Sequence, residues 1–150
     1  MSRAKSYEYG INRSLQIPYD PSAQVRLIPN KPAEAEYFDC FSRHGVTHVF
    51  NSWNAMPPID EQMALPGSRT NPNLIAARFL LKPGRSYEEA VKTFQPYDRV
   101  KEPNPVARSA GKALIAEGKL AGPKRTTLIF VNNRLEGNAL ETIRAMIEAD

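Results

Sequence analysis

The sequence predicts an α/β fold in which about four parallel strands are separated by helices. Short apolar runs rich in β-branched residues alternate along the chain with longer segments of helical periodicity. Strands that alternate with helices form right-handed βαβ units, and such units build a parallel sheet. The chain has 150 residues, the size of one ordinary domain. We therefore expect a (β/α) domain over residues 24–150 and an extended or poorly ordered arm at residues 1–23.

The first predicted unit is a strand followed by a helix. Residues 25–28 form a short apolar run that a proline-containing loop closes. Residues 33–43 place Tyr37, Phe38 and Phe41 on one helical face, and Gly45 follows as a stop signal. The arm before this unit has prolines, tyrosines and little periodicity, so we expect no chemistry there.

The second and third predicted strands cover residues 46–50 and 74–81. The second strand is β-branched and aromatic, and it runs into a polar loop at residues 51–58. After the third strand, Ser86 and Glu89 form the S-x-x-E capping box that opens a helix through Phe94. Pro96 is predicted to end this helix.

The last predicted unit begins with a helix at Asn104 and Pro105, which suit an N-cap and a first helical position. This helix should end at Gly118 and bury a stripe formed by Val106, Ala110, Leu114 and Ile115. The fourth strand covers residues 126–131, and the closing helix, residues 138–149, should bury Leu140, Ile143, Met146 and Ile147. Four strands alone would leave two unpaired edges and an inner face carrying Val25, Val49, Ala77 and Ile129.

Composition and charge indicate a solvated, slightly basic surface. The formal net charge is +4, but lysines and arginines are scattered among acidic residues and form no basic run. The single cysteine, Cys40, excludes a disulfide within the chain and is predicted to be a small buried side chain in a reducing compartment. No apolar stretch is long enough to cross a bilayer, and residues 1–20 contain no hydrophobic signal core. We expect a cytoplasmic protein without a membrane partner.

Several catalytic classes lack their motifs. The chain has no G-x-S-x-G elbow, no P-loop, no dinucleotide fingerprint and no Cys-His pair with a recognisable spacing. His44 and His48 straddle Gly45 at a change from helix to strand, so they do not share a helical face as metal ligands must. We therefore expect neither a metal nor a cofactor, and whether the protein is an enzyme stays open.

Polar residues follow the third and fourth predicted strands, where the carboxyl ends of parallel strands and helix N-termini converge. Lys82, Arg85 and Arg134 would supply positive charge, while Gly84 and Gly137 would let the backbone approach a ligand. Amide donors and acceptors would come from Asn132, Asn133 and Asn138. The combination predicts a site for a phosphate-containing small molecule or a nucleic-acid backbone.

A purely structural interpretation of the same residues stays open. Gly84 would then only form a turn, Asn138 would only cap a helix, and the arginines would pair with acidic neighbours, namely Glu88, Glu89 or Glu136. Glu136 is also our candidate for a general acid or base, because it is the one carboxylate within the predicted site. A carboxylate beside Arg134 or Lys82 would instead favour a salt bridge.

The loop after the second strand is a separate binding candidate. Asn51, Trp53 and Asn54 place an indole between two amides, an arrangement that stacks on a base or a sugar ring in some proteins. The alternative is that Trp53 belongs to the core or to an interface.

A wider pattern covers about residues 24–149. It consists of residues 37–54, 80–91 and 94–97, the Met56-Pro57-Pro58 loop, and the run Val131-Asn132-Asn133-Arg134-Leu135-Glu136-Gly137-Asn138. This pattern resembles the C-terminal half of the domain of unknown function 72, the YecE-like family. Members of that family are similar to complete TIM barrels, so the resemblance implies a partial TIM-barrel-like domain that carries the later strands.

The same resemblance adds one candidate residue and marks two departures. Where much of the family has a Glu-x-Arg strand, this chain has Gln24-Val25-Arg26, so Arg26 joins the candidate ligand-binding residues. Where many members have histidines after the last two strands, this chain has residues 82–85 and Arg134. The family has no settled biochemical activity, so the resemblance bears on the fold more than on the function.

Three classes of function remain. The first is a ligand-binding or enzymatic domain of an uncharacterised family, with an anion site at the carboxyl ends of the strands. The second is an interaction or assembly protein, in which the half-barrel covers its open edges with another copy or a partner chain. The third is an inert fragment. We expect the first class, and we also expect a homo-oligomer, because self-association covers the exposed edges.

Overall fold

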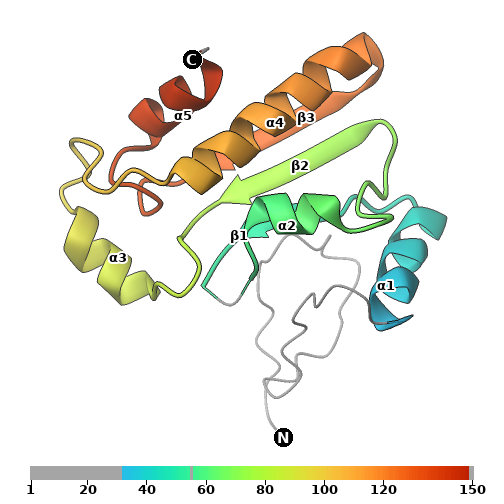
Figure 1. The fold of residues 1–150 in the computed structure, drawn as a ribbon, viewed down its shortest axis with the longest axis horizontal. Helices are drawn as coiled ribbons and strands as arrows, with labels where there is room; N and C mark the ends of the chain where they lie inside the picture. The colour runs from blue at the N-terminus through green and yellow to red at the C-terminus, as the bar shows by residue number, and fades with distance from the viewer. Residues whose placement is uncertain (1–31, 55, 149–150) are drawn as a thin grey trace, which may run out of the picture.

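The computed structural model describes residues 32–54 and 56–148, with side chains described from residue 36 onward. Its centre is a parallel sheet of three strands, β1 (Val49–Ser52), β2 (Leu74–Phe79) and β3 (Thr126–Val131), in the order β1-β2-β3. Phe50 of β1 and Ile129 of β3 both lie opposite Ala77 of β2. β2 is therefore the central strand (Figure 1).

Five α-helices flank this sheet in the described part of the chain. α1 (Pro32–Arg43) precedes β1, and α2 (Ile59–Ala64) connects β1 to β2. α3 (Tyr87–Phe94), α4 (Pro105–Ala121) and the short 3-10 turn η1 (Gly122–Lys124) lie between β2 and β3 in the chain, and α5 (Ala139–Ile147) follows β3. Figure 1 shows α1 and α3 at opposite ends of the molecule, with α4 running beside β3.

The core lies between one face of the sheet and the helices α2, α4 and α5. Side chains of the sheet that enter it include Phe50, Ile75, Ala77 and Phe79. The helices and the β3–α5 loop contribute Ile59, Ala107, Ala110, Leu114, Leu135 and Met146. Burying a large apolar side chain stabilises a fold by about 1.5–3 kcal/mol, so this cluster holds the helices on the sheet.

The helix starts confirm the capping signals of the sequence. Ser86 and Glu89 form the predicted capping box at α3, each side chain accepting a hydrogen bond from the backbone N–H of the other residue. Asn104 accepts from the N–H of Ala107 and so caps α4. Asn138 caps α5 in the same way. Each cap satisfies a backbone N–H that the first helical turn leaves unpaired.

The predicted assignment of sheet faces was wrong for two residues. Ala77 and Ile129 pack beneath the helices rather than on the uncovered face. Side chains alternate along a strand, so the other face of β3 carries Leu128 and Phe130, which are 41% and 57% exposed. Val49 lies opposite Ala76 and therefore on this second face, as predicted.

The two edges of the sheet differ. At the β1 edge, the Gln62 side chain accepts from the N–H of Asn51 at 2.9 Å and donates to the Asn51 carbonyl at 2.9 Å. Gln62, which is fully buried, thereby makes the pair of contacts that a further strand would make there. At the other edge, β3 has no neighbouring strand among the described residues.

Three of the four predicted strands are described, and the fourth, at residues 25–28, lies with the arm at 1–23 outside the described residues. Other predictions were wrong in their extent. β1 begins at Val49 rather than at residue 46, and α2 was not predicted. α4 continues past Gly118 to Ala121, because the missing side chain of Gly118 makes room for Thr127, whose hydroxyl would lie 2.5 Å from an added Cβ.

The predicted buried stripes were only partly right. Ala110, Leu114 and Met146 are buried, but a second group is exposed, with exposed fractions of 51%, 78% and 62% for Val106, Leu140 and Ile147. α5 is rotated so that Thr142 and Met146 face the core, which turns its two large terminal side chains outward. Cys40 is a free thiol of intermediate burial.

Candidate functional site

A pocket of about 230 Å³ lies at the carboxyl ends of β1 and β2. It is bounded by the last residues of both strands, the loop after β2 and the starts of α2 and α4, namely Ser52, Pro58, Ile59, Phe79, Lys82, Pro83, Asn104, Val106 and Ala107. Most of these side chains are apolar, and Lys82 is the charged one. In open α/β sheets this edge is where ligands bind, because the loops and helix N-termini converge there.

The loop after β2 is fastened to the end of β1. The N–H groups of Leu80 and Leu81 donate to the Ser52 carbonyl at 3.2 and 3.1 Å, and the Ser52 hydroxyl donates to the Leu81 carbonyl at 2.6 Å. Gly84 donates from its N–H to the Asn54 carbonyl at 3.0 Å. These bonds fix the backbone on both sides of Lys82, whose side chain is exposed and makes no ion pair with any described residue.

The first turn of α4 borders the pocket and contains no acidic residue. The first turns of α2, α3 and α5 all contain at least one. The N-terminus of α4 nevertheless already has partners, because the buried Glu136 carboxylate accepts from the N–H of Asn104 and the Asn104 side chain accepts from that of Ala107. The group in the pocket lining that favours an anion is therefore the amine of Lys82.

A more polar hollow of about 460 Å³ lies on the other side of the same loop, bounded by Lys82, Pro83, Gly84, Arg85, Glu89 and Thr93. Arg85 is engaged there, since its guanidinium pairs with Glu102 at 2.6 Å and lies 5.0 Å from the ring centre of Phe94. The capping bond from the Ser86 backbone lowers the pKa of Glu89, so that carboxylate is ionised at neutral pH. The hollow thus contains a negative group and a neutralised arginine.

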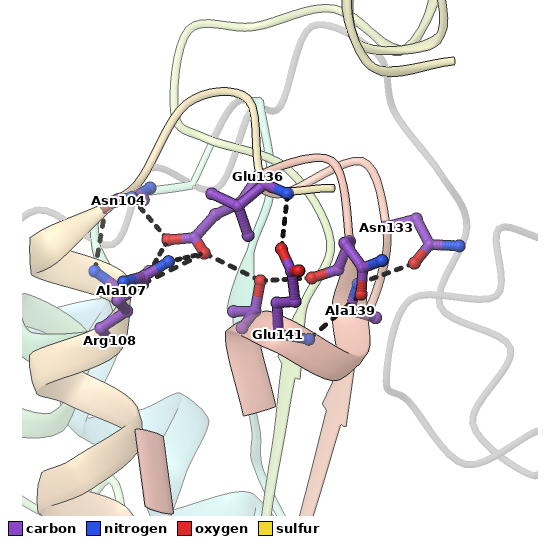
Figure 2. Close-up of polar contacts among 10 residues, drawn as sticks. Asn104, Ala107, Arg108, Asn133, Glu136, Ala139 and Glu141 are labelled. Atoms are coloured by element: carbon purple, nitrogen blue, oxygen red, sulfur yellow. Dashed lines mark hydrogen bonds and ion pairs between the residues drawn. The ribbon is translucent and has the colours of Figure 1, made fainter. Parts of the chain in front are cut away.

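The loop after β3 uses its amides to hold itself together (Figure 2). The side-chain oxygen of Asn132 accepts from the N–H of Arg134 at 3.0 Å, and that of Asn133 accepts from the N–H of Ala139 at 2.7 Å. Asn138 caps α5 and also donates from its amide nitrogen to the Tyr97 carbonyl at 3.2 Å. None of the three side chains lines either pocket.

Gly137 and Arg134 also have structural partners. Gly137 has a φ of +116°, and an added Cβ would lie 2.5 Å from the Arg99 carbonyl, so glycine is required for the approach of residues 99–101. The guanidinium of Arg134 donates to the Tyr87 hydroxyl at 2.8 Å and lies 4.3 Å from the centre of that ring. The predicted pairing of the arginines with Glu88, Glu89 or Glu136 does not describe Arg134.

Glu136 is the centre of a buried network rather than an exposed group. Its carboxylate is fully buried and accepts from the guanidinium of Arg108 at 2.8 and 2.9 Å, from the Thr142 hydroxyl at 2.8 Å and from the backbone N–H of Asn104. Figure 2 shows these contacts joining the β3–α5 loop to the start of α4. Its oxygens are therefore occupied by donors, which favours a structural role over the predicted acid or base role.

The Asn51 loop is divided between core and surface. The Asn51 backbone pairs with Gln62, and the side-chain oxygen of Asn51 is buried without a hydrogen-bond partner within residues 32–54 and 56–148. Trp53 packs against the cluster of Leu81, Ala90 and Phe94, and Asn54 is exposed. These residues do not line the pocket beside Lys82. Arg26 lies outside the described residues.

His48 is a packed residue that lies just before β1. Its ring contacts Phe38 and Phe50 edge-on, each at 5.1 Å between ring centres, and its Nε2 atom has no hydrogen-bond partner among the described residues. Burial lowers the pKa of His48 to about 4 and raises that of its neighbour Tyr37 to about 12. Neither side chain carries charge at neutral pH. No group of three potential metal-ligating side chains occurs within the described ranges.

Sequence reasoning missed the residues that build the pocket and the network. Ile59 belongs to a helix that was not predicted, and Val106 was expected in the core. Arg108 and Gln62 had no sequence signal, because their partners lie 28 and 11 positions away and only the fold brings them together. The exposure of Lys82 and the engagement of Arg85 likewise depend on tertiary contacts.

Comparison of the chain with protein-family models, with curated proteins and with solved structures gave no match. Within the described residues, no helix combines the length and apolar character needed to span a membrane.

Proposed function

We propose that this protein binds a small phosphate-containing ligand in the pocket at the carboxyl ends of β1 and β2. The observation that carries the proposal is the pocket itself, whose lining contains no carboxylate but contains Lys82, an exposed lysine that makes no ion pair with any described residue. The charge of a lysine stabilises a bound phosphate. Of the loop residues that the sequence indicated as ligand-binding, the proposal therefore keeps Lys82.

The residues that line the two cavities favour phosphate binding in the pocket beside α4 over binding in the polar hollow. The pocket contains no carboxylate, whereas the hollow contains the ionised Glu89 and an arginine that Glu102 already neutralises. An anion in the hollow would be repelled by Glu89. We therefore assign the phosphate to the α4 side of Lys82 and give Arg85 no direct role.

Isothermal titration of the full chain with inorganic phosphate at low salt tests the proposal. Lys82→Gln should weaken binding by roughly ten-fold, the loss expected for one charge-assisted contact. Lys92→Gln is the matched control, because Lys92 is an exposed lysine on α3 outside both pockets. Equal weakening in the two variants would indicate a non-specific charge effect and reject the site.

The fold-family assignment belongs to the same proposal. We infer a partial TIM-barrel-like domain of the YecE-like family from the residue pattern, and the parallel sheet with helices on one face is compatible with a barrel wall. A nucleic-acid backbone would be a special case of the phosphate ligand.

Self-association is a second candidate function, favoured by the β3 edge. The outward face of β3 carries Leu128 and Phe130, its six residues contain no charge, and no described strand pairs with its outer side. Natural proteins protect such edges with charges or cover them. Light scattering with chromatography should then give a dimer that Phe130→Lys converts to a monomer and that Leu120→Lys, at an exposed position of α4, leaves intact.

A further inference from the structure

We propose that the partner at the β3 edge is a second copy of this chain, whose β3 pairs with it antiparallel in one register, with Ile129 opposite Ile129 of the second copy. The inference rests on the self-association proposed above and adds the partner strand, its direction and its register. It is independent of the phosphate site, because no residue of β3 lines that pocket.

The backbone of β3 turns its unpaired groups outward at alternate residues. The N–H of Thr126 donates to the Asn73 carbonyl at 2.9 Å, and the N–H of Asn132 donates to the Phe79 carbonyl at 2.8 Å. Backbone groups alternate in direction along a strand, so the even-numbered residues of β3 bond to β2. The outward N–H and C=O groups belong to the odd-numbered residues, Thr127, Ile129 and Val131. No described strand pairs with this side of β3.

The three outward residues are symmetric about Ile129. In an antiparallel sheet, two residues whose backbone groups face each other exchange both hydrogen bonds. With Ile129 on a two-fold axis, Thr127 of each copy faces Val131 of the other, and every outward group has a partner. A two-fold interface is self-complementary, so the same strand supplies both halves of this match.

The side chains on the uncovered face of the sheet select the same register. Leu128 and Phe130 are 41% and 57% exposed. With Ile129 on the axis, Leu128 of one copy lies opposite Phe130 of the other, in a pair whose Cα atoms are about 4.5 Å apart. Moving the axis to Leu128 places Phe130 opposite Thr126, and moving it to Phe130 places Leu128 opposite Asn132. Both shifted registers set an apolar side chain against a polar one and bury less apolar surface.

The charges around β3 permit this pairing. The six residues of the strand contain no charged side chain. Next to the strand, Arg125 lies opposite Asn133 of the second copy, and its guanidinium is already paired with Glu117 at 3.1 Å. The first like-charged pair, Lys124 with Arg134, falls outside both strands, and the Arg134 side chain is bonded to α3. The edge therefore lacks the charges with which proteins prevent such pairing.

Backbone amide hydrogen exchange of the full chain, followed by nuclear magnetic resonance, tests the interface. The amides of Thr127, Ile129 and Val131 should exchange at least about ten-fold more slowly in the dimer than in Phe130→Lys, whose added charge prevents pairing. The amides of Thr126 and Leu128 bond to β2 and should stay protected in both proteins. Dilution of the unaltered chain should act like Phe130→Lys, and the matched control, Leu120→Lys, should exchange like the unaltered chain.

Cysteine pairing tests the register, in a Cys40→Ser background that removes the free thiol. A non-hydrogen-bonded antiparallel pair has the Cα separation that a disulfide needs. A mixture of Leu128→Cys and Phe130→Cys chains should therefore form a covalent dimer under mild oxidation, whereas neither variant alone should. Cross-linking of either variant alone would identify a shifted register and reject the one centred on Ile129.

The remaining outcomes separate this inference from the proposed self-association. A dimer whose odd-numbered β3 amides exchange freely would keep the self-association and reject the β3 interface. A monomer with protected edge amides would show that the chain covers this edge itself. A monomer with unprotected edge amides would leave the edge to a different partner strand. Both monomer results reject the second copy together with the self-association.

Discussion

The loop after β2, residues 80–86, and the loop after β3, residues 132–138, contain the same kinds of residue at the same edge of the sheet. Both have a basic residue, a glycine with positive φ and a residue that caps the next helix. The polar groups of the β3 loop bond to one another and to neighbouring elements such as α3 and α4, whereas the amine of Lys82 in the β2 loop makes no ion pair with any described residue. Similar residues therefore brace the fold in the β3 loop, whereas in the β2 loop we propose that they bind a ligand.

The largest expected effect comes from removing a partner of Glu136 in the buried network of the β3 loop. Arg108→Met would leave the buried Glu136 carboxylate without its counter-charge, and the loss of one partner of a buried pair costs about 3–5 kcal/mol. Urea unfolding should show this loss of stability. Arg144→Met is the control, because it removes an exposed arginine that pairs with Glu148 and should leave the unfolding midpoint unchanged. A small effect of Arg108→Met would mean that the network does not hold the loop.

The next largest effect comes from acid, through the buried His48 beside β1. The folded pKa of His48 is lowered to about 4, so the unfolded chain takes up a proton first as the pH falls. Stability is therefore full above the unfolded pKa of about 6.5 and is lost between that value and 4, by about 3 kcal/mol in total.

Unfolding curves across this pH range provide the measurement. His48→Leu should remove the part of the pH dependence between about 6.5 and 4, while His44→Gln, at an exposed histidine, should retain it. If His48→Leu keeps the full dependence, the acid sensitivity arises elsewhere.

An intermediate loss of stability is expected from the helix caps, Ser86 in the β2 loop and Asn138 in the β3 loop. The two loops should behave alike in this respect. Asn138→Ala and Ser86→Ala each remove a side-chain acceptor from the first turn of a helix, and each should cost about 1 kcal/mol. Thermal unfolding measures both. A much larger loss for Asn138→Ala would show that its second bond, to the Tyr97 carbonyl, contributes more than the cap.

The smallest expected effect on stability belongs to Lys82. Lys82→Gln changes an exposed side chain without an ion pair, so the unfolding midpoint should stay where it is while phosphate binding weakens. A clear loss of stability would show that Lys82 is a structural residue, and the contrast between the two loops would disappear.

Local signals in the sequence predicted much of the fold. The capping box at Ser86, the Asn104-Pro105 start and the β-branched run of residues 126–131 depend on neighbours a few positions away, and all three were confirmed. It was harder to predict which face of a helix is buried and where each helix or strand begins and ends. The rotation of α5, which exposes Leu140, follows from how Met146 packs on α4, and a pattern of apolar residues does not encode that choice.

The sequence predicted a binding site at the carboxyl ends of the strands, where the structure has a pocket, but it did not predict which polar side chains have partners. Arginines and asparagines looked available because sequence shows donors and acceptors without their partners. Only the fold brings Tyr87 to Arg134 and Glu102 to Arg85. Lys82 differs from these residues, because it forms no ion pair with an acidic side chain in the described part of the chain.

The most direct test of the account is a nuclear magnetic resonance titration of the full chain with inorganic phosphate, followed at backbone amides. The account predicts shifts confined to the pocket, at the backbone amides of Ser52, Ile59, Phe79, Lys82, Asn104, Val106 and Ala107, and their loss in Lys82→Gln but not in Lys92→Gln. Shifts centred on residues 132–138, or no saturable shift at all, would contradict the claim that the β2 loop binds phosphate and that the β3 loop has a structural role.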